Sequence, residues 1–297
     1  MKNLIIPLVL ILLLFVSCKN DDSKSKKGSN MNTQSANDSV VFNSDYSEVN
    51  GLKMYYETHG TKGDLLVLIH GGGSTIGTTF GRILPILARY NKVIAVELQA
   101  HGHTSDRNAP ESFEQDADDV ATLLHNLNIS KASFFGFSNG GNTAMQIAIR
   151  HPDIVNKLII ASAFYKREGM QPGLFDGLRQ ATIKNMPQYL KNAFLQITPD
   201  SSRLLSMFNK DRERMLHFKD WKDEDLRSIK APSLIIGGDK DVMLSNHAVA
   251  MSNLIANSRL MILPATHGSY MGADNLDPGS AILEMTAAII EDFLNKK

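Results

Sequence analysis

A serine between two glycines is the pattern in this chain that points most directly to chemistry. The segment Gly-Phe-Ser-Asn-Gly at positions 136–140 follows an apolar run, Ala132–Phe137, and precedes a helical pattern, Asn139–His151. A strand, a sharp turn and a helix in this order present a serine hydroxyl at the end of the strand, and the glycines leave room for the turn. We therefore expect Ser138 to be a catalytic nucleophile.

A serine hydroxyl needs a base, and the base needs an acid that orients it. His267 follows the strand-like run Leu260–Leu263, the place where a base is expected after the last strand. Two carboxylates, Asp239 and Asp241, follow the run that ends at Ile236. An acid must leave the strand and turn back toward the histidine, so Asp241 is predicted as the acid, with Asp239 as the alternative.

Glycines after the first long apolar strand could expose backbone N–H groups to a developing negative charge. The run Leu65–Ile69 ends in His-Gly-Gly-Gly at 70–73. Together with the N–H of Asn139, the N–H of Gly72 would supply two donors to an oxyanion, and Gly73 is the alternative to Gly72. We interpret His70 as a structural residue.

Apolar runs and helical patterns alternate along the chain from residue 40, which is typical of a doubly wound α/β fold with a mostly parallel sheet. Two earlier strands, Ser39–Asn43 and Leu52–Thr58, are predicted to form an antiparallel edge. The expected inner strands are Leu65–Ile69, Val93–Leu98, Ala132–Phe137, Leu158–Ala163, Ser233–Ile236 and Leu260–Leu263. The expected helices are Thr79–Tyr90, Phe113–Asn126, Asn139–His151, Asn246–Ala256 and Ala281–Leu294.

Residues 165–222 interrupt this alternation, because they contain no strand-like run but are rich in Met, Phe and Leu. We expect three or four short helices inserted between two strands. Their apolar side chains either face a substrate or form the core of the insert itself, and the sequence leaves both interpretations open.

With these motifs in place, the chain resembles the α/β-hydrolase superfamily from about residue 50 to 295. The resemblance is carried by residues 70–73, 93–105, 136–140 and 231–241 and by His267. In the family the acid stands three residues after a glycine, which corresponds here to Gly238 and Asp241. The family segment Asp-Leu-Arg-Gly-His-Gly is Glu-Leu-Gln-Ala-His-Gly at 97–102, and the insert resembles the family's helical cap.

The resemblance implies hydrolysis of carboxylic esters of small to medium, partly apolar molecules through an acyl-serine intermediate. No metal or organic cofactor is expected, and the partner is a small-molecule ester or lactone. A lactonase or a carbon–carbon bond hydrolase would use the same three residues. A non-catalytic ligand-binding lipoprotein is the alternative from a different class.

The N-terminus predicts export. The apolar run Leu4–Val16 is too short to span a bilayer, which needs about 20 residues, and it follows a basic residue as in a secretory signal peptide. The segment from Phe15 to Cys18 resembles the lipobox of bacterial lipoproteins, although the family usually has Leu at the first position. This predicts lipid attachment at Cys18 and anchoring in the bacterial cell envelope, at the periplasmic or outer surface.

Five segments are therefore expected along the chain. They are a signal peptide at 1–17, a polar disordered tether at 18–38, a first part of the hydrolase core at 39–164, the cap at 165–222 and a second part of the core at 223–297.

Composition restricts the function classes further. The chain has 297 residues, with Lys+Arg 31 against Asp+Glu 31, and one cysteine. Without a basic excess, a general nucleic-acid binder is not expected. A single cysteine excludes an intrachain disulfide and a cysteine-based zinc cluster.

Overall fold

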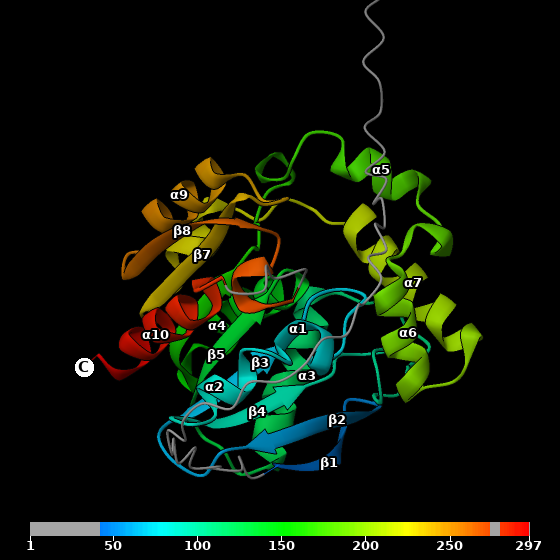
Figure 1. Ribbon diagram of the computed structural model, residues 1–297, viewed down its shortest axis with the longest axis horizontal. Helices are drawn as coiled ribbons and strands as arrows, with labels where there is room; N and C mark the ends of the chain where they lie inside the picture. Colours follow the sequence, from blue (N-terminus) through cyan, green and yellow to red (C-terminus); the bar gives the residue numbers. More distant parts are fainter. Residues whose placement is uncertain (1–41, 274–279, 297) are drawn as a thin grey trace, which may run out of the picture. The chain divides into compact units, whose positions relative to one another are not determined.

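One mixed sheet of eight strands organises the protein in this computed structural model, which describes residues 42–273 and 280–296 (Figure 1). The order across the sheet is β1-β2-β4-β3-β5-β6-β7-β8, and every pair from β4 to β8 is parallel. The strands are β1 Phe42–Val49, β2 Leu52–His59, β3 Leu65–Ile69, β4 Lys92–Val96, β5 Ala132–Phe137, β6 Val155–Ala161, β7 Ser233–Lys240 and β8 Ser258–Thr266. The predicted α/β-hydrolase architecture, a mostly parallel doubly wound sheet, is confirmed.

The antiparallel edge differs from the prediction in its first strand. The expected strand Ser39–Asn43 begins outside the described residues, and β1 instead runs on to Val49. The reason is a two-residue turn, Asn50-Gly51, in which both residues have positive φ, 45° and 82°. Such a turn matches the twist of a hairpin and fixes the pairing of Val49 with Leu52.

Helices cover both faces of the sheet, and alternate side chains of one strand point to opposite faces. Leu66 and Leu68 of β3 belong to the apolar cluster that includes α1, α2 and α10, whereas Val67 and Ile69 belong to the cluster that includes α3, α4 and α9. These helices are α1 Ile76–Phe80, α2 Leu84–Leu87, α3 Phe113–Asn126, α4 Asn139–Arg150, α9 Ser245–Leu254 and α10 Ile282–Asn295. Both faces of the inner strands are therefore buried, as their apolar sequences require.

The single helix predicted at Thr79–Tyr90 is wrong, because two short helices, α1 and α2, occupy this region. Gly81 caps the end of α1, and Pro85 stands in the first turn of α2. Proline has no N–H to continue a helical ladder but suits a helix start, so the chain breaks between them.

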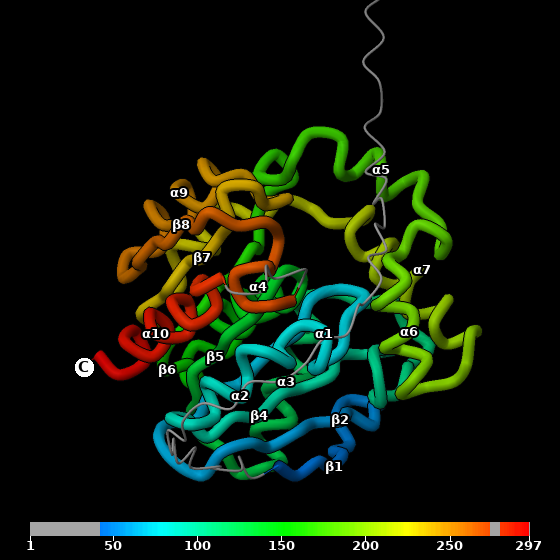
Figure 2. The backbone as a smooth tube through the Cα atoms, in the orientation of Figure 1, coloured from blue at the N-terminus to red at the C-terminus, as the bar shows by residue number. Residues whose placement is uncertain are grey.

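The insert between β6 and β7 is helical (Figure 2). It contains α5 Leu174–Gln180, α6 Gln188–Ile197 and α7 Ser201–Leu216, two short 3₁₀ turns, Arg167–Gly169 and Ile183–Asn185, and is followed by α8 Asp223–Arg227. Met186, Phe194, Leu204 and Met207 are buried together in it. These side chains mainly form the core of the insert itself.

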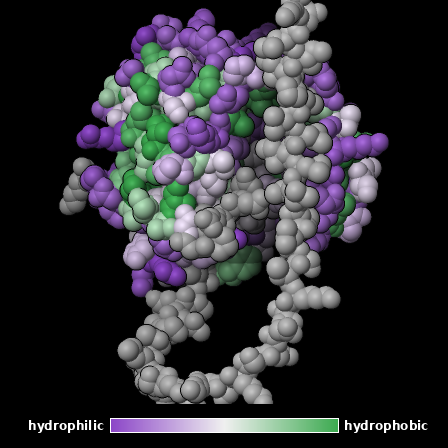
Figure 3. All heavy atoms as spheres, turned by 45° about the horizontal axis from the view of Figure 1, so that its top comes forward, coloured by the Kyte–Doolittle hydropathy of each residue, from purple (hydrophilic) through white to green (hydrophobic). Residues whose placement is uncertain are grey.

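Apolar residues are also exposed where β8 forms the edge of the sheet. Leu260 and Ile262 of β8 and Met285 and Ile289 of α10 are among the exposed large apolar side chains. Figure 3 shows apolar surface gathered on the side of the molecule where these elements lie.

No helix of the described residues is long and apolar enough to cross a membrane. The predicted signal peptide, tether and Cys18 lie outside the described residues.

Candidate active site

Ser138 stands in the turn between β5 and α4, with a positive backbone φ. Its φ is 54° and its ψ is −123°, a strained region for a residue with a side chain. A Cβ at Gly136 would collide with the carbonyl of Gly140, and one at Gly140 would collide with the carbonyl of Ile69. Both glycines are therefore required by the turn that presents the serine.

Hydrogen bonds connect the three residues predicted as nucleophile, base and acid. The Nε2 atom of His267 is 3.1 Å from the Oγ of Ser138, and its Nδ1 is 2.6 Å from the Oδ1 of Asp241. The Nδ1–H therefore donates to the carboxylate, which leaves Nε2 free to accept the serine proton. His267 is partly exposed, and the side chain of Asp241 is fully buried.

The structure separates the two candidate acids. Asp239 lies near the surface, and its Oδ1 accepts a hydrogen bond of 3.0 Å from the N–H of Ala265. Burial alone would raise the pKa of Asp241, but hydrogen bonds from His267, Ser162 and the Gly238 N–H hold that pKa below its ordinary value. A buried carboxylate that stays charged is what an orienting acid needs.

Two residues that the sequence did not single out support Asp241: Ser162 contacts it directly, and Tyr270 contacts Ser162. The hydroxyl of Ser162, directly after β6, donates to Oδ2 of Asp241, and it lies 2.7 Å from the hydroxyl of the fully buried Tyr270. Ser162 also has a positive φ of 52°. No local motif predicts this contact, since 79 residues separate Ser162 from Asp241.

The predicted oxyanion donors lie beside Ser138, in the loop after β3 and at the start of α4. A Cβ at Gly72 would lie 2.4 Å from Nδ2 of Asn139, so glycine lets the loop approach the start of α4 without moving that side chain. The N–H of Gly73 already donates to Oδ2 of Asp211 at 2.5 Å. The Gly72 N–H makes no hydrogen bond within the described residues, which leaves it available to an oxyanion.

The nearby His70 is structural, as interpreted from the sequence. The N–H of Leu98 donates to its Nε2 at 3.0 Å, so its Nδ1 carries the proton and donates to the carbonyl of Gly71 at 2.7 Å. Burial, together with the nearby His101, lowers the pKa of His70 to about 3. The ring is therefore neutral and ties β4 to the glycine loop.

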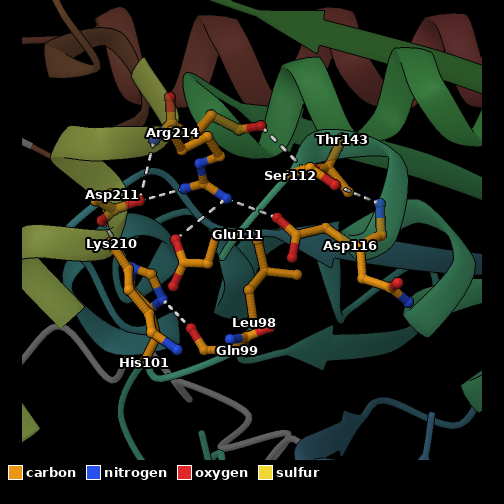
Figure 4. Close-up of polar contacts among 12 residues, drawn as sticks. Leu98, Gln99, His101, Glu111, Ser112, Asp116, Thr143, Lys210, Asp211 and Arg214 are labelled. Atoms are coloured by element: carbon orange, nitrogen blue, oxygen red, sulfur yellow. Dashed lines mark hydrogen bonds and ion pairs between the residues drawn. The ribbon is translucent and has the colours of Figure 1, made fainter. Parts of the chain in front are cut away.

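A buried charge cluster joins the cap to this loop, and sequence reasoning missed it. The cluster consists of His101, Glu111, Asp116, Asp211 and Arg214, and Figure 4 shows these five side chains converging from the core and from α7. Oδ2 of Asp211 lies 2.9 Å from Nε2 of His101, and Oδ1 pairs with Arg214. Arg214 in turn reaches Asp116 at 2.7 Å and Glu111 at 3.6 Å.

The charges of this cluster compensate one another. Burial alone would lower the pKa of His101, but the Asp211 carboxylate raises it to about 9. Burial alone would raise the pKa of Asp211, and His101 and Arg214 hold it below its ordinary value. Two cations therefore neutralise the carboxylate that lies beside the oxyanion loop, so that it does not oppose negative charge developing there.

Apolar side chains of the cap also lie over the loop. A Cβ at Gly73 would lie 3.5 Å from Cε of Met186 and 4.0 Å from Cδ1 of Leu190. Among the described residues, no group of three or more His, Cys, Asp or Glu side chains could hold a metal ion. The hydrogen-bonded series of Ser138, His267 and Asp241 can perform nucleophilic attack by Ser138 with proton transfer through His267.

Comparison with known proteins agrees with this geometry. The model of the alpha/beta hydrolase fold family matches residues 64–201. The human serine hydrolase BPHL is 27% identical over 231 residues, which covers 73% of this chain and 77% of that protein.

Solved structures share the fold at lower identity. An enol-lactonase from Burkholderia xenovorans has a TM-score of 0.66 and 21% identity over 85% of this chain and all of its own. A meta-cleavage product hydrolase from Pseudomonas fluorescens has a TM-score of 0.69 and 20% identity over 84% of this chain and 98% of its own. These likenesses show that the chain has the α/β-hydrolase fold.

Proposed function

We propose that this protein hydrolyses carboxylic esters of small to medium, partly apolar molecules through an acyl-serine intermediate. The observation that carries the proposal is the continuous hydrogen-bonded series from Ser138 through His267 to Asp241. Ser138 attacks the carbonyl carbon while His267 takes the hydroxyl proton. His267 then gives this proton to the leaving alcohol, and Asp241 stabilises the imidazolium that exists between the two transfers.

The oxyanion of each tetrahedral intermediate receives hydrogen bonds from the N–H groups of Gly72 and Asn139. A donor of this kind typically contributes a factor of about 10²–10³ in rate. The second half of the reaction repeats the first with water, which His267 activates by taking a proton. His267 returns this proton to the Oγ of Ser138 as the acyl–oxygen bond breaks, which regenerates the free enzyme and releases the carboxylic acid.

The nature of the substrate is inferred from the cap. Met186 and Leu190 lie over the glycine loop, which favours an apolar group in the substrate. The charge of Asp211 is already compensated by His101 and Arg214, so this carboxylate does not demand a cationic substrate.

A substrate panel tests the proposal. The full-length chain in detergent is assayed with p-nitrophenyl esters of increasing acyl length, thioesters, lactones and a meta-cleavage dienoate, with Ser138→Ala as control. We expect the wild type to hydrolyse esters and the Ser138→Ala variant to lose this activity. Preference for lactones or for the dienoate would move the reaction to a lactonase or a carbon–carbon bond hydrolase, and inertness to every substrate would favour a non-catalytic binding protein.

We further propose that the mature protein is a lipoprotein of the bacterial cell envelope, attached through Cys18. The support is the order of basic residue, short apolar run and cysteine in the sequence. Metabolic labelling with a radioactive fatty acid should mark the wild-type chain and not Cys18→Ala. Equal labelling of both, or of neither, would refute the attachment.

A further inference from the structure

One carboxylate of the cap contacts both segments that carry the expected oxyanion donors. Oδ2 of Asp211, on α7, accepts a hydrogen bond of 2.5 Å from the N–H of Gly73, the residue after Gly72. Its Oδ1 lies 3.3 Å from Nδ2 of Asn139, the first residue of α4, which donates to it. A single side chain of the cap therefore joins the loop after β3 to the start of α4.

The same carboxylate lies beside Gly72. A Cβ at Gly72 would lie 3.2 Å from Oδ2 of Asp211. By its charge alone, a carboxylate at this place would oppose an oxyanion, because like charges repel. Its contribution to the site is therefore the geometry that its two hydrogen bonds impose on the donors.

The protein keeps this carboxylate charged but neutralised. Nδ1 of His101 lies 2.8 Å from the carbonyl oxygen of Gln99, and Nε2 lies 2.9 Å from Oδ2 of Asp211. Because both ring nitrogens face oxygen acceptors, both carry protons and the ring is a cation. Arg214 pairs with the other oxygen of Asp211, as Figure 4 shows. An anion that accepts hydrogen bonds from two segments is thus held beside the donors without leaving a net negative charge there.

Helix α7 is attached to the core by further hydrogen bonds. Nη2 of Arg203 donates to the carbonyl of Thr104 at 2.9 Å. Nζ of Lys210 donates to the carbonyl of Arg107 at 2.8 Å. Both carbonyls belong to the segment between β4 and α3, so the core holds the helix that carries Asp211.

We propose that Asp211 is a positioning residue that aligns the two oxyanion donors, so that the cap and not the core alone completes the active site. The inference rests on the proposed hydrolysis. Asp211 acts through Gly73 on the adjacent N–H of Gly72, and through the side chain of Asn139 on the N–H at the start of α4. Because a misplacement of about 1 Å can cost about 10²-fold in rate, a carboxylate that fixes both donors has a measurable effect on the reaction.

A trifluoromethyl ketone measures the quality of the oxyanion site without turnover. The Oγ of Ser138 forms a bond to its carbonyl carbon, the π pair of the carbonyl becomes the oxyanion, and the serine proton moves to Nε2 of His267. The matching methyl ketone has the same alkyl chain, but its carbonyl is far less electrophilic and it binds without forming the oxyanion. Fluorine NMR of the full-length chain in detergent measures the affinity of trifluoromethyl butyl ketone directly and that of methyl butyl ketone by displacement.

Two variants remove contacts of Asp211, and a third is the control. Asp211→Asn keeps the shape of the side chain but leaves one oxygen for two hydrogen bonds, and Asn139→Ala removes one contact while the ion pairs of Asp211 remain. Each should weaken binding of the trifluoromethyl ketone about tenfold and leave binding of the methyl ketone unchanged. Lys210→Met removes hydrogen bonds of the same helix that end at residues 106–109, and should change neither affinity by more than about twofold.

The outcomes distinguish this inference from the proposed hydrolysis. An unchanged affinity for the trifluoromethyl ketone in either variant, an equal loss of affinity for the two ketones, or a control that weakens the trifluoromethyl ketone as much as Asp211→Asn would overturn the inference. In all of these results the wild type still forms the adduct, so the proposed hydrolysis stands. A wild type that forms no adduct would refute the nucleophilic role of Ser138, and this inference with it.

Discussion

Replacing Glu111 by Gln should stabilise the protein above neutral pH and flatten the pH dependence of its stability. Glu111 is buried, and neither of its carboxyl oxygens accepts a hydrogen bond. Burial raises its pKa from 4.5 to about 8, against the attraction of Arg214. Burial alone would lower the pKa of His101, but Asp211 raises it from 6.5 to about 9. At neutral pH the folded protein therefore holds protons that the unfolded chain has released.

The sign of the effect follows from these protons. A state that binds more protons loses stability as the pH rises. The proton on Glu111 contributes fully to the free energy of unfolding below pH 4.5, and this contribution is lost as the pH approaches 8. The proton on His101 contributes fully below pH 6.5, and its contribution is lost as the pH approaches 9. Each group changes the free energy of unfolding by about 1.4 kcal/mol per pH unit while the two states differ by one proton.

Between pH 6.5 and pH 8 both groups contribute, so the wild type should lose about 3–4 kcal/mol of unfolding free energy. Glutamine has no carboxyl proton to lose, so the variant should lose only about half as much. Urea unfolding at the two pH values measures this difference. Glu114→Gln is the matched control, because Glu114 lies three residues further along the chain, in α3, is only partly buried and should leave the wild-type slope unchanged. A wild-type stability equal at both pH values, or a Glu111→Gln slope equal to that of the wild type, would refute the reasoning.

Three further predictions concern the candidate site. Asp241→Asn should lower kcat by about 10⁴, as loss of the orienting acid does in serine enzymes. In the same ester assay the kcat of Asp239→Asn should stay within about threefold of the wild type. The reverse order would exchange the roles of the two residues. Ser162→Ala should lower kcat about tenfold with KM unchanged, because it removes one hydrogen bond to Asp241, worth about 1–2 kcal/mol. An unchanged kcat would leave Ser162 with a purely structural role. Asp211→Ala should lower the unfolding free energy by about 3–5 kcal/mol, because it leaves His101 without its buried carboxylate and removes one of the carboxylates that pair with Arg214. Thermal or urea unfolding measures this loss, and a change below about 1 kcal/mol would contradict it.

Local sequence pattern was sufficient for the elements that carry the site. Val67 and its neighbours point alternately to the two buried faces of the sheet, and a continuous apolar run in the sequence predicts such a strand. The glycines around Ser138 predict a sharp turn. Strand order places His267 and the segment before Asp241 at the same edge of the sheet. The break between α1 and α2 was missed although Gly81 and Pro85 both mark it.

Long-range contacts account for the features that the sequence did not reveal. Asp211 reaches the glycine loop only because α7 packs over the core, and nothing near Asp211 in the chain encodes the direction of that packing. Ser162 contacts Asp241 from the end of β6, and Tyr270, which follows β8, contacts Ser162. Such contacts depend on tertiary arrangement, which periodicity and turn residues do not specify.

Covalent labelling of the serine tests the central proposal most directly. The full-length chain is incubated with a fluorophosphonate, digested and examined by mass spectrometry, with Ser138→Ala and His267→Ala as controls. The account predicts one adduct per chain on Ser138, no adduct in Ser138→Ala and labelling at least about 10²-fold slower in His267→Ala, since the base activates the nucleophile. An unlabelled wild type, or a Ser138→Ala variant labelled as fast as the wild type, would contradict it.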